Sequence, residues 1–213
     1  MDLQSIIEKV ERYAMDVYKD SKVLSHDFLH TKRVVALSLK LGKRLGLDSK
    51  ELALLEIAAW LHDIAIAKYG TKENHAEKSA EIAELLLDEM LPKEYMEIVV
   101  EAIRKHSWSE REKPSSPIGE ILQDADRLDA LGAVGIYRTI AYGVATGKKF
   151  YCEEDPFAKK RELDDVKYII DHFYTKLLKI PEKLNTDVAR EEAEKRIKIM
   201  KKFLEELRRE LEQ

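Results

Sequence analysis

The most informative stretch of the sequence is LALLEIAAWLHDIAIA, residues 52–67, which is apolar except at Glu56, His62 and Asp63. The imidazole and the carboxylate are adjacent, in surroundings typical of a protein core. A carboxylate that is buried without a partner is strongly destabilising. The stretch therefore predicts that another group compensates the charge of Asp63.

The composition indicates a globular protein. Of the 213 residues, 45% are apolar and 37% are charged, which suits one domain, or one domain with an appendage. The formal net charge of −4 argues against general nucleic-acid binding. The apolar run is too short to cross a bilayer, so we expect no membrane association. The mixed charges of MDLQSIIEKVERY, residues 1–13, are unlike a signal or transit peptide. The single cysteine, Cys152, favours a cytoplasmic location.

The chain is expected to be all-α. It contains eight glycines and five prolines, and we find no strand-like alternation of useful length. Gly46 suits the position that follows a helix end, and Asp48 suits the N-cap of the next helix. The expected helices cover about residues 2–18, 26–46, 48–63, 73–90, 92–106, 117–132, 133–145, 164–179 and 185–211.

Four histidines share one placement on these helices. Each continues the apolar face of its own predicted helix and lies near a helix end: His30, His62, His75 and His106. A single histidine on such a face is usually a hydrogen-bonded core residue. Four of them beside Asp63 instead predict a bound divalent cation. Imidazole and carboxylate ligands suit Mn, Fe, Co, Ni or Zn, and the lack of thiolate clusters argues against a structural zinc site.

Four segments carry a resemblance to a known family. HDFLHTKRV (26–34), LHDIA (61–65), IRKHS (103–107) and LQDADRLDALGA (122–133) together resemble the HD-domain metal-dependent phosphohydrolase superfamily over about residues 20–145. The resemblance implies an all-α, HD-domain-like helical bundle with a metal site at its centre.

The resemblance also implies the ligands of one metal ion, which are His30, His62, Asp63 and Asp126. Asp63 is the expected catalytic residue. Asp124 is the fallback for Asp126, although we favour a solvated or locally paired carboxylate for Asp124 and Asp129.

Some HD proteins hold two metal ions with two further histidines. His75 and His106 stand where those residues would fall, so they are expected either to bind a second ion, bridged by Asp63, or to contact phosphate. The cofactor is then one or two divalent ions, a transition metal or Mg. Ser107 follows His106, so the doubled histidine of the dinuclear cyclic-dinucleotide subgroup is missing.

HD proteins mostly hydrolyse phosphate esters and anhydrides with a metal-activated water. The resemblance therefore implies a small phosphorylated substrate, for which we expect a nucleotide. The segment IAIAKYGT after Asp63 lacks the acidic residues of the monophosphatase subgroup, which favours the broader phosphohydrolase or pyrophosphohydrolase activity. The alternatives are a phosphodiesterase for cyclic or oligonucleotides and a nucleotide sensor with a metal-bearing pocket.

Basic side chains near the signature residues are candidates for holding the substrate. Arg33 follows His30 by three residues and is the strongest of them, with His26, Lys68 and Lys105 as further candidates.

The expected domains are an HD-type helical domain over residues 1–181, with its motif core at about 20–145, and a C-terminal helix over 182–213. That helix has an apolar stripe, which predicts packing on the domain or, alternatively, a homodimer seam. The stripe comprises Ala189, Ala193, Ile197, Met200, Leu204, Leu207 and Leu211.

Overall fold

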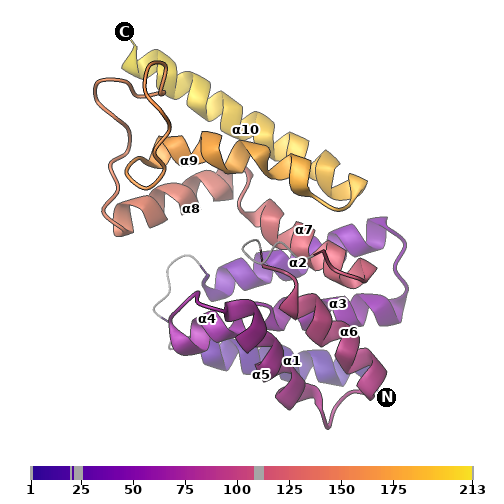
Figure 1. Cartoon of the computed structure of the whole chain (residues 1–213). Helices are drawn as coiled ribbons and strands as arrows, with labels where there is room; N and C mark the ends of the chain where they lie inside the picture. Colours follow the sequence, from indigo (N-terminus) through magenta and orange to yellow (C-terminus); the bar gives the residue numbers. More distant parts are fainter. Residues whose placement is uncertain (1, 20, 22–25, 108–112, 213) are drawn as a thin grey trace. The chain divides into compact units, whose positions relative to one another are not determined.

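The computed structural model describes residues 2–19, 21, 26–107 and 113–212. Within these residues the protein is helical, with a single isolated bridge between Lys149 and Tyr168 in place of any strand (Figure 1). The elements are α1 (Leu3–Lys19), α2 (Phe28–Arg44), α3 (Ser49–Leu61), α4 (Ile64–Tyr69), α5 (His75–Leu87), α6 (Lys93–Arg104), α7 (Pro117–Asp129), α8 (Gly132–Ala145), α9 (Ile169–Thr175), the 3₁₀ helix η1 (Leu177–Lys183) and α10 (Asp187–Leu211). The expected all-α fold class is confirmed.

The chain divides into two compact units, residues 1–126 and residues 127–213. We call them unit 1 and unit 2 and describe each by itself. The expected division into a domain over 1–181 and a helix over 182–213 stays a prediction. None of the helices in the described ranges combines the length and the hydrophobicity that a membrane span requires.

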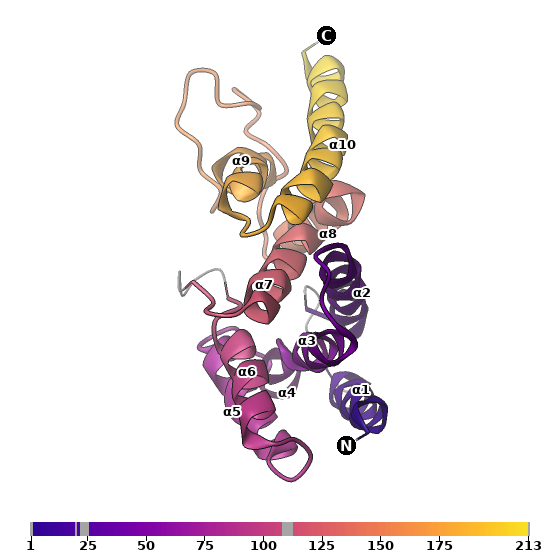
Figure 2. The ribbon, with the colours of Figure 1, turned by 90° about the vertical axis from the view of Figure 1, so that its right-hand side faces the viewer.

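Helix α3 is the central element of unit 1. It packs against α1, α2, α5 and α6, and Figure 2 shows it between these helices. A helix that is apolar on all sides is buried, and α3 follows this rule from Ala53 to Leu55 and again from Ile57 to Leu61. At its start, Asp48 and Glu51 form a capping box. The predicted N-cap at Asp48 is thus confirmed, as is Gly46, which follows the end of α2 with φ +79°.

The expected helix over 48–63 is too long at its C-terminal end. Helix α3 ends at Leu61, and His62 and Asp63 lie in a turn before the unpredicted helix α4. Asp63 leaves the helical region with φ −111° and ψ 15°. The apolar pattern continues across this break, because α3 and α4 are both buried, so periodicity alone gives no sign of it.

The expected helix over 164–179 is also wrong in its bounds. Helix α9 begins only at Ile169, because Asp164 and Asp165 form local bonds that favour a turn. The Asp164 backbone N–H donates to Asp171 Oδ2 at 2.7 Å, and its own carboxylate accepts from the Lys167 N–H at 3.2 Å. Beyond Thr175 the chain continues as η1, which contains Pro181.

In unit 2, α10 packs against α8 and η1. Five residues of the predicted apolar stripe are buried there: Ala189, Ala193, Ile197, Met200 and Leu204. The stripe therefore serves packing inside unit 2, while the predicted homodimer seam stays a prediction.

The segment before α9 is held by Arg161, whose Nη2 donates to Asp171 Oδ1 at 2.8 Å.

One hydrogen bond joins the break between α3 and α4 to helix α5. The backbone N–H of Ala65 lies in the first turn of α4, where a helix provides no acceptor, and it donates to Ser79 Oγ of α5 at 3.1 Å. Both residues are buried. The bond fixes the end of the His62–Asp63 turn against α5.

We expect Ser79→Ala to lower the free energy of unfolding by about 1–3 kcal/mol, because it leaves the buried Ala65 N–H without an acceptor. Urea denaturation followed by circular dichroism measures the change. Ser38→Ala is the matched control, since Ser38 is equally buried and its Oγ has no hydrogen-bond partner among the described residues. Equal losses in the two variants would contradict a specific role for the Ser79 bond.

Candidate metal centre

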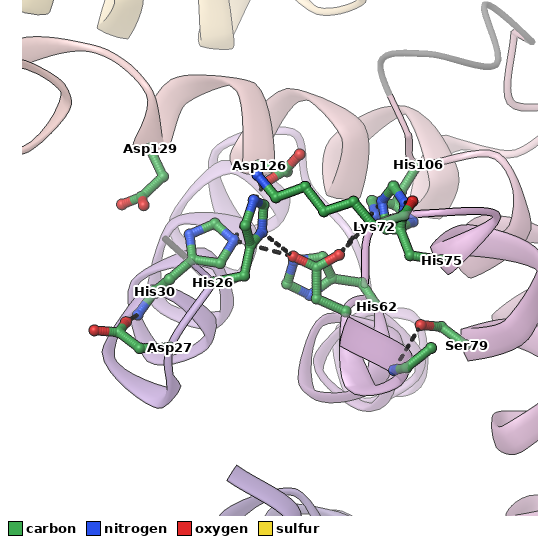
Figure 3. A network of polar contacts seen from close by, with 12 residues as sticks. His26, Asp27, His30, His62, Lys72, His75, Ser79, His106, Asp126 and Asp129 are labelled. Carbon is green, nitrogen blue, oxygen red and sulfur yellow. Dashed lines mark hydrogen bonds and ion pairs between the residues drawn. The ribbon is translucent and has the colours of Figure 1, made fainter. Parts of the chain in front are cut away.

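The candidate metal centre is assembled from helix ends of unit 1 together with α7 (Figure 3). His30 lies in the first turn of α2, where the N-cap Asp27 accepts a hydrogen bond from its backbone N–H at 2.7 Å. His75 is the first residue of α5 and His106 follows the end of α6. Asp126 projects from α7. Three helix ends and α7, from four parts of the sequence, thus place their side chains at one point.

The break between α3 and α4 lets His62 and Asp63 point to the same place. Neighbouring residues on a continuous helix diverge by about 100°, so the two side chains would otherwise face different directions. With the turn between the helices, His62 Nε2 lies 3.4 Å from Asp63 Oδ2. The two side chains therefore converge where the backbone leaves the helical region at Asp63.

Five imidazoles surround the carboxylate of Asp63, which is 1% exposed. Asp63 Oδ2 lies 2.5 Å from His26 Nδ1, 3.5 Å from His30 Nε2 and 3.4 Å from His62 Nε2. Asp63 Oδ1 lies 3.6 Å from His75 Nε2 and 3.3 Å from His106 Nε2. The second carboxylate, Asp126, has its Oδ1 3.4 Å from His30 Nε2.

Backbone carbonyls orient three of the rings. The Nδ1 atoms of His62, His75 and His106 lie 2.8, 2.9 and 2.6 Å from the carbonyl oxygens of Ala59, Lys72 and Ile103. A carbonyl only accepts, so each Nδ1 carries the proton and donates it. Each Nε2 of a neutral ring then presents a lone pair to the centre. This is the arrangement in which a histidine binds a metal ion.

The donor set fits a divalent cation. His62 Nε2 is buried and makes no hydrogen bond to any described residue. Two ligands about 2.1 Å from one ion and roughly 90–110° apart are separated by about 3.0–3.5 Å. Most separations around Asp63 fall near this range, which is long for a hydrogen bond. The ligand atoms of His30, His62 and Asp126 lie within 4.8 Å of one another, as do those of His62, Asp63 and His106.

The pKa shifts of Asp63 and His75 agree with a ligand role, whereas that of His106 reflects its contact with Asp63. Burial would raise the pKa of Asp63, but the adjacent His62 and His26 outweigh it and hold the pKa well below its usual range. Burial lowers the pKa of His26 to about 4 and also lowers that of His75. For His106, contact with Asp63 outweighs burial and raises the pKa. The centre therefore combines an ionised carboxylate with neutral imidazoles at His26 and His75.

The structure treats the two candidate aspartates of α7 differently. Asp126 joins the cluster, whereas Asp124 is fully buried and belongs to none of the metal-binding groups found among the described residues. Asp129 is 1% exposed, and Arg138 Nη1 donates to its Oδ2 at 2.5 Å. Neither carboxylate is solvated, and the expected local pair is found for Asp129.

The four predicted substrate-binding residues differ in position, exposure and contacts. His26 lies at the cluster, with its side chain 17% exposed. Arg33 is half-buried on α2. Lys68 is exposed, with Nζ 5.6 Å from the ring centroid of Tyr69, and Lys105 Nζ lies 3.2 Å from Glu101 Oε1.

Sequence reasoning missed Lys72. Its carbonyl orients His75, and Figure 3 shows its side chain extending over the cluster. Lys72 stands three residues before His75 in a polar connection. That spacing was its single sequence signal, because the conformation of a loop does not follow from periodicity.

Known proteins share both the sequence pattern and the fold. The HD domain family matches residues 27–131. YpgQ of Bacillus subtilis is 30% identical over 208 residues, which cover 96% of this chain and 93% of YpgQ. The crystal structure of YpgQ in complex with ADP has a TM-score of 0.77 over 99% of this chain and 97% of that chain.

Two further solved structures are named as HD-superfamily hydrolases. One, from Bacillus thuringiensis, is 32% identical, with a TM-score of 0.74 over 98% of this chain and 97% of that chain. The other, predicted to be such a hydrolase, comes from an uncultured Thermotogales bacterium and is 29% identical, with a TM-score of 0.68 over 99% of each chain. Together with the His/Asp cluster, these relatives indicate a metal-dependent hydrolase. The chain belongs to the HD-domain phosphohydrolase superfamily.

Proposed function

We propose that this protein hydrolyses phosphate ester or anhydride bonds of a small phosphorylated substrate, a nucleotide. The observation that carries the proposal is the convergence of four imidazole Nε2 atoms on the buried carboxylate of Asp63 in an HD-domain fold. Such a donor set has one common chemical use, which is to hold a divalent cation.

In this proposal His30, His62, Asp63 and Asp126 hold one ion. The contacts of the two Asp63 oxygens favour a second ion. Oδ2 faces His30 and His62, while Oδ1 faces His75 and His106. A carboxylate with ligands on both sides is suited to bridge two ions. Nitrogen and oxygen donors suit Mn, Fe, Co, Ni or Zn, and Mg remains an alternative.

A divalent cation supplies an acidified water and neutralises charge on the phosphoryl oxygens. The chain supplies the fixed geometry. The carbonyls of Ala59, Lys72 and Ile103 keep three Nε2 atoms turned inward. His26 Nδ1 donates to Asp63 Oδ2, which keeps that carboxylate in place. Buried apolar residues of α3 and α4 exclude bulk water from behind the cluster.

The nucleotide part of the proposal is supported by YpgQ, which has been solved in complex with ADP. The absence of acidic residues in IAIAKYGT, residues 64–71, favours phosphate or pyrophosphate release from a polyphosphate over monophosphatase activity. Arg33 is the proposed substrate contact on α2, and His26 is the proposed contact at the edge of the cluster. A cytoplasmic location is proposed from the use of a single cysteine, Cys152.

The reaction can be tested with purified protein and Mn²⁺, Co²⁺, Ni²⁺ or Mg²⁺ against nucleoside mono-, di- and triphosphates and cyclic nucleotides. We expect phosphate or pyrophosphate to be released from the polyphosphates, with loss of activity in EDTA and recovery when metal is restored, because the cation supplies the nucleophile. A linear nucleotide formed from a cyclic one would instead identify a phosphodiesterase. Tight nucleotide binding without turnover under every metal would contradict an enzymatic function.

The ligand assignment on α7 can be tested separately. We expect Asp126→Asn to weaken Mn²⁺ binding at least tenfold. Even mutation of a residue that only hydrogen-bonds to a metal ligand lowers metal affinity by roughly 10–100-fold. Asp124→Asn is the matched control and should bind Mn²⁺ as the unchanged protein does. Calorimetric titration measures both, after circular dichroism has shown each variant to be folded. The reverse order of the two affinities would assign the ligand to Asp124.

A further inference from the structure

Lys72 lies in a connection whose backbone is fixed at both ends. Gly70 ends α4 with φ 69°, and Asn74 precedes α5 with φ 50°. The carbonyl of Lys72 accepts a hydrogen bond from His75 Nδ1 at 2.9 Å. The start of the Lys72 side chain is therefore held at a set place beside one of the imidazoles of the cluster.

The side chain of Lys72 reaches the cluster from its solvent side. The residue is exposed, and Figure 3 shows the side chain extending from the His75 side of the cluster towards Asp126. The side chain of Lys72 thus lies over the cluster, and the residue is exposed to solvent.

The two lysines predicted from sequence are less well placed. Lys68 Nζ lies over the ring of Tyr69, and Lys105 Nζ forms an ion pair with Glu101. Lys72 differs from both in that its side chain lies over the cluster (Figure 3). With one ion bound, the carboxylates of Asp63 and Asp126 cancel its charge, and the ammonium group of Lys72 would supply the positive charge that a polyanionic substrate needs; with two ions bound, it would add to their charge.

We propose that the ammonium group of Lys72 binds a non-bridging phosphoryl oxygen of the substrate at the His/Asp cluster. The proposal rests on the proposed function and deepens it, because it assigns a phosphate contact outside the signature residues. An ammonium group is a common partner of phosphate and contributes a charge-assisted hydrogen bond.

The test measures binding rather than turnover. Metal-loaded protein is titrated by calorimetry with ADP and, as a probe without a base, with inorganic pyrophosphate, and its metal content is measured in parallel. We expect Lys72→Gln to weaken the binding of both probes by about 10- to 100-fold, with unchanged metal content. Lys72→Arg should keep most of the affinity. Lys93→Gln is the matched control, since Lys93 is exposed on α6 and lies 3.9 Å from Glu97; it should bind both probes as the unchanged protein does.

Two results would overturn the assignment of Lys72. The first is Lys72→Gln that binds both probes as tightly as the unchanged protein. The second is Lys72→Gln that binds metal more tightly with unchanged probe affinity, which would make the lysine a counter-ion of the carboxylates. If the unchanged protein binds pyrophosphate but hydrolyses no nucleotide, the proposed function is contradicted. The assignment of Lys72 then stands or falls with the affinities of the Lys72 variants. Unchanged protein that binds neither probe would overturn both proposals.

Discussion

The buried carboxylate of Asp63 is the main constraint on unit 1. It is 1% exposed, and its two oxygens lie within 3.6 Å of five imidazole nitrogens. Removing an ionised carboxylate from water is costly unless charge and hydrogen bonds replace the solvent. The chain meets this cost with rings brought from four separate regions of unit 1. The same burial therefore gives unit 1 both a buried core and a candidate cation site.

The geometry of the cluster depends on where helices stop. Helix α3 is buried on nearly all sides, and beyond its end at Leu61 the backbone leaves the helical region at Asp63. The ends of α4, α5 and α6 place Lys72, His75 and His106 in the same way. Because ring orientation is fixed by carbonyls at these same ends, the donor atoms converge without long or flexible side chains.

Most residues of the cluster could be predicted from the sequence. The features that could not be predicted have physical reasons. The apolar spacing of His30, His62, His75 and His106 is local information, and it predicted that all four face the core. The family signature added Asp126, whose position in α7 lies at the cluster. The break at Asp63 was missed because burial on both sides of it hides any change of period. Lys72 was missed because a polar loop has no periodicity. The bounds of α9 were missed because Asp164 and Asp165 bond to Asp171 and Thr175, which lie further along the chain than a helical pattern reads.

Asp63 and the imidazoles around it are proposed to form a divalent metal site. The most direct test of this proposal is the affinity for Mn²⁺ of the unchanged protein, Asp63→Asn and His62→Gln, with His172→Gln as control because His172 pairs with Asp165 in unit 2. We expect one or two ions to bind to the unchanged protein and to His172→Gln, and binding to be lost in the other two variants while their helical circular dichroism is kept. Unchanged Mn²⁺ affinity in folded Asp63→Asn would contradict the account.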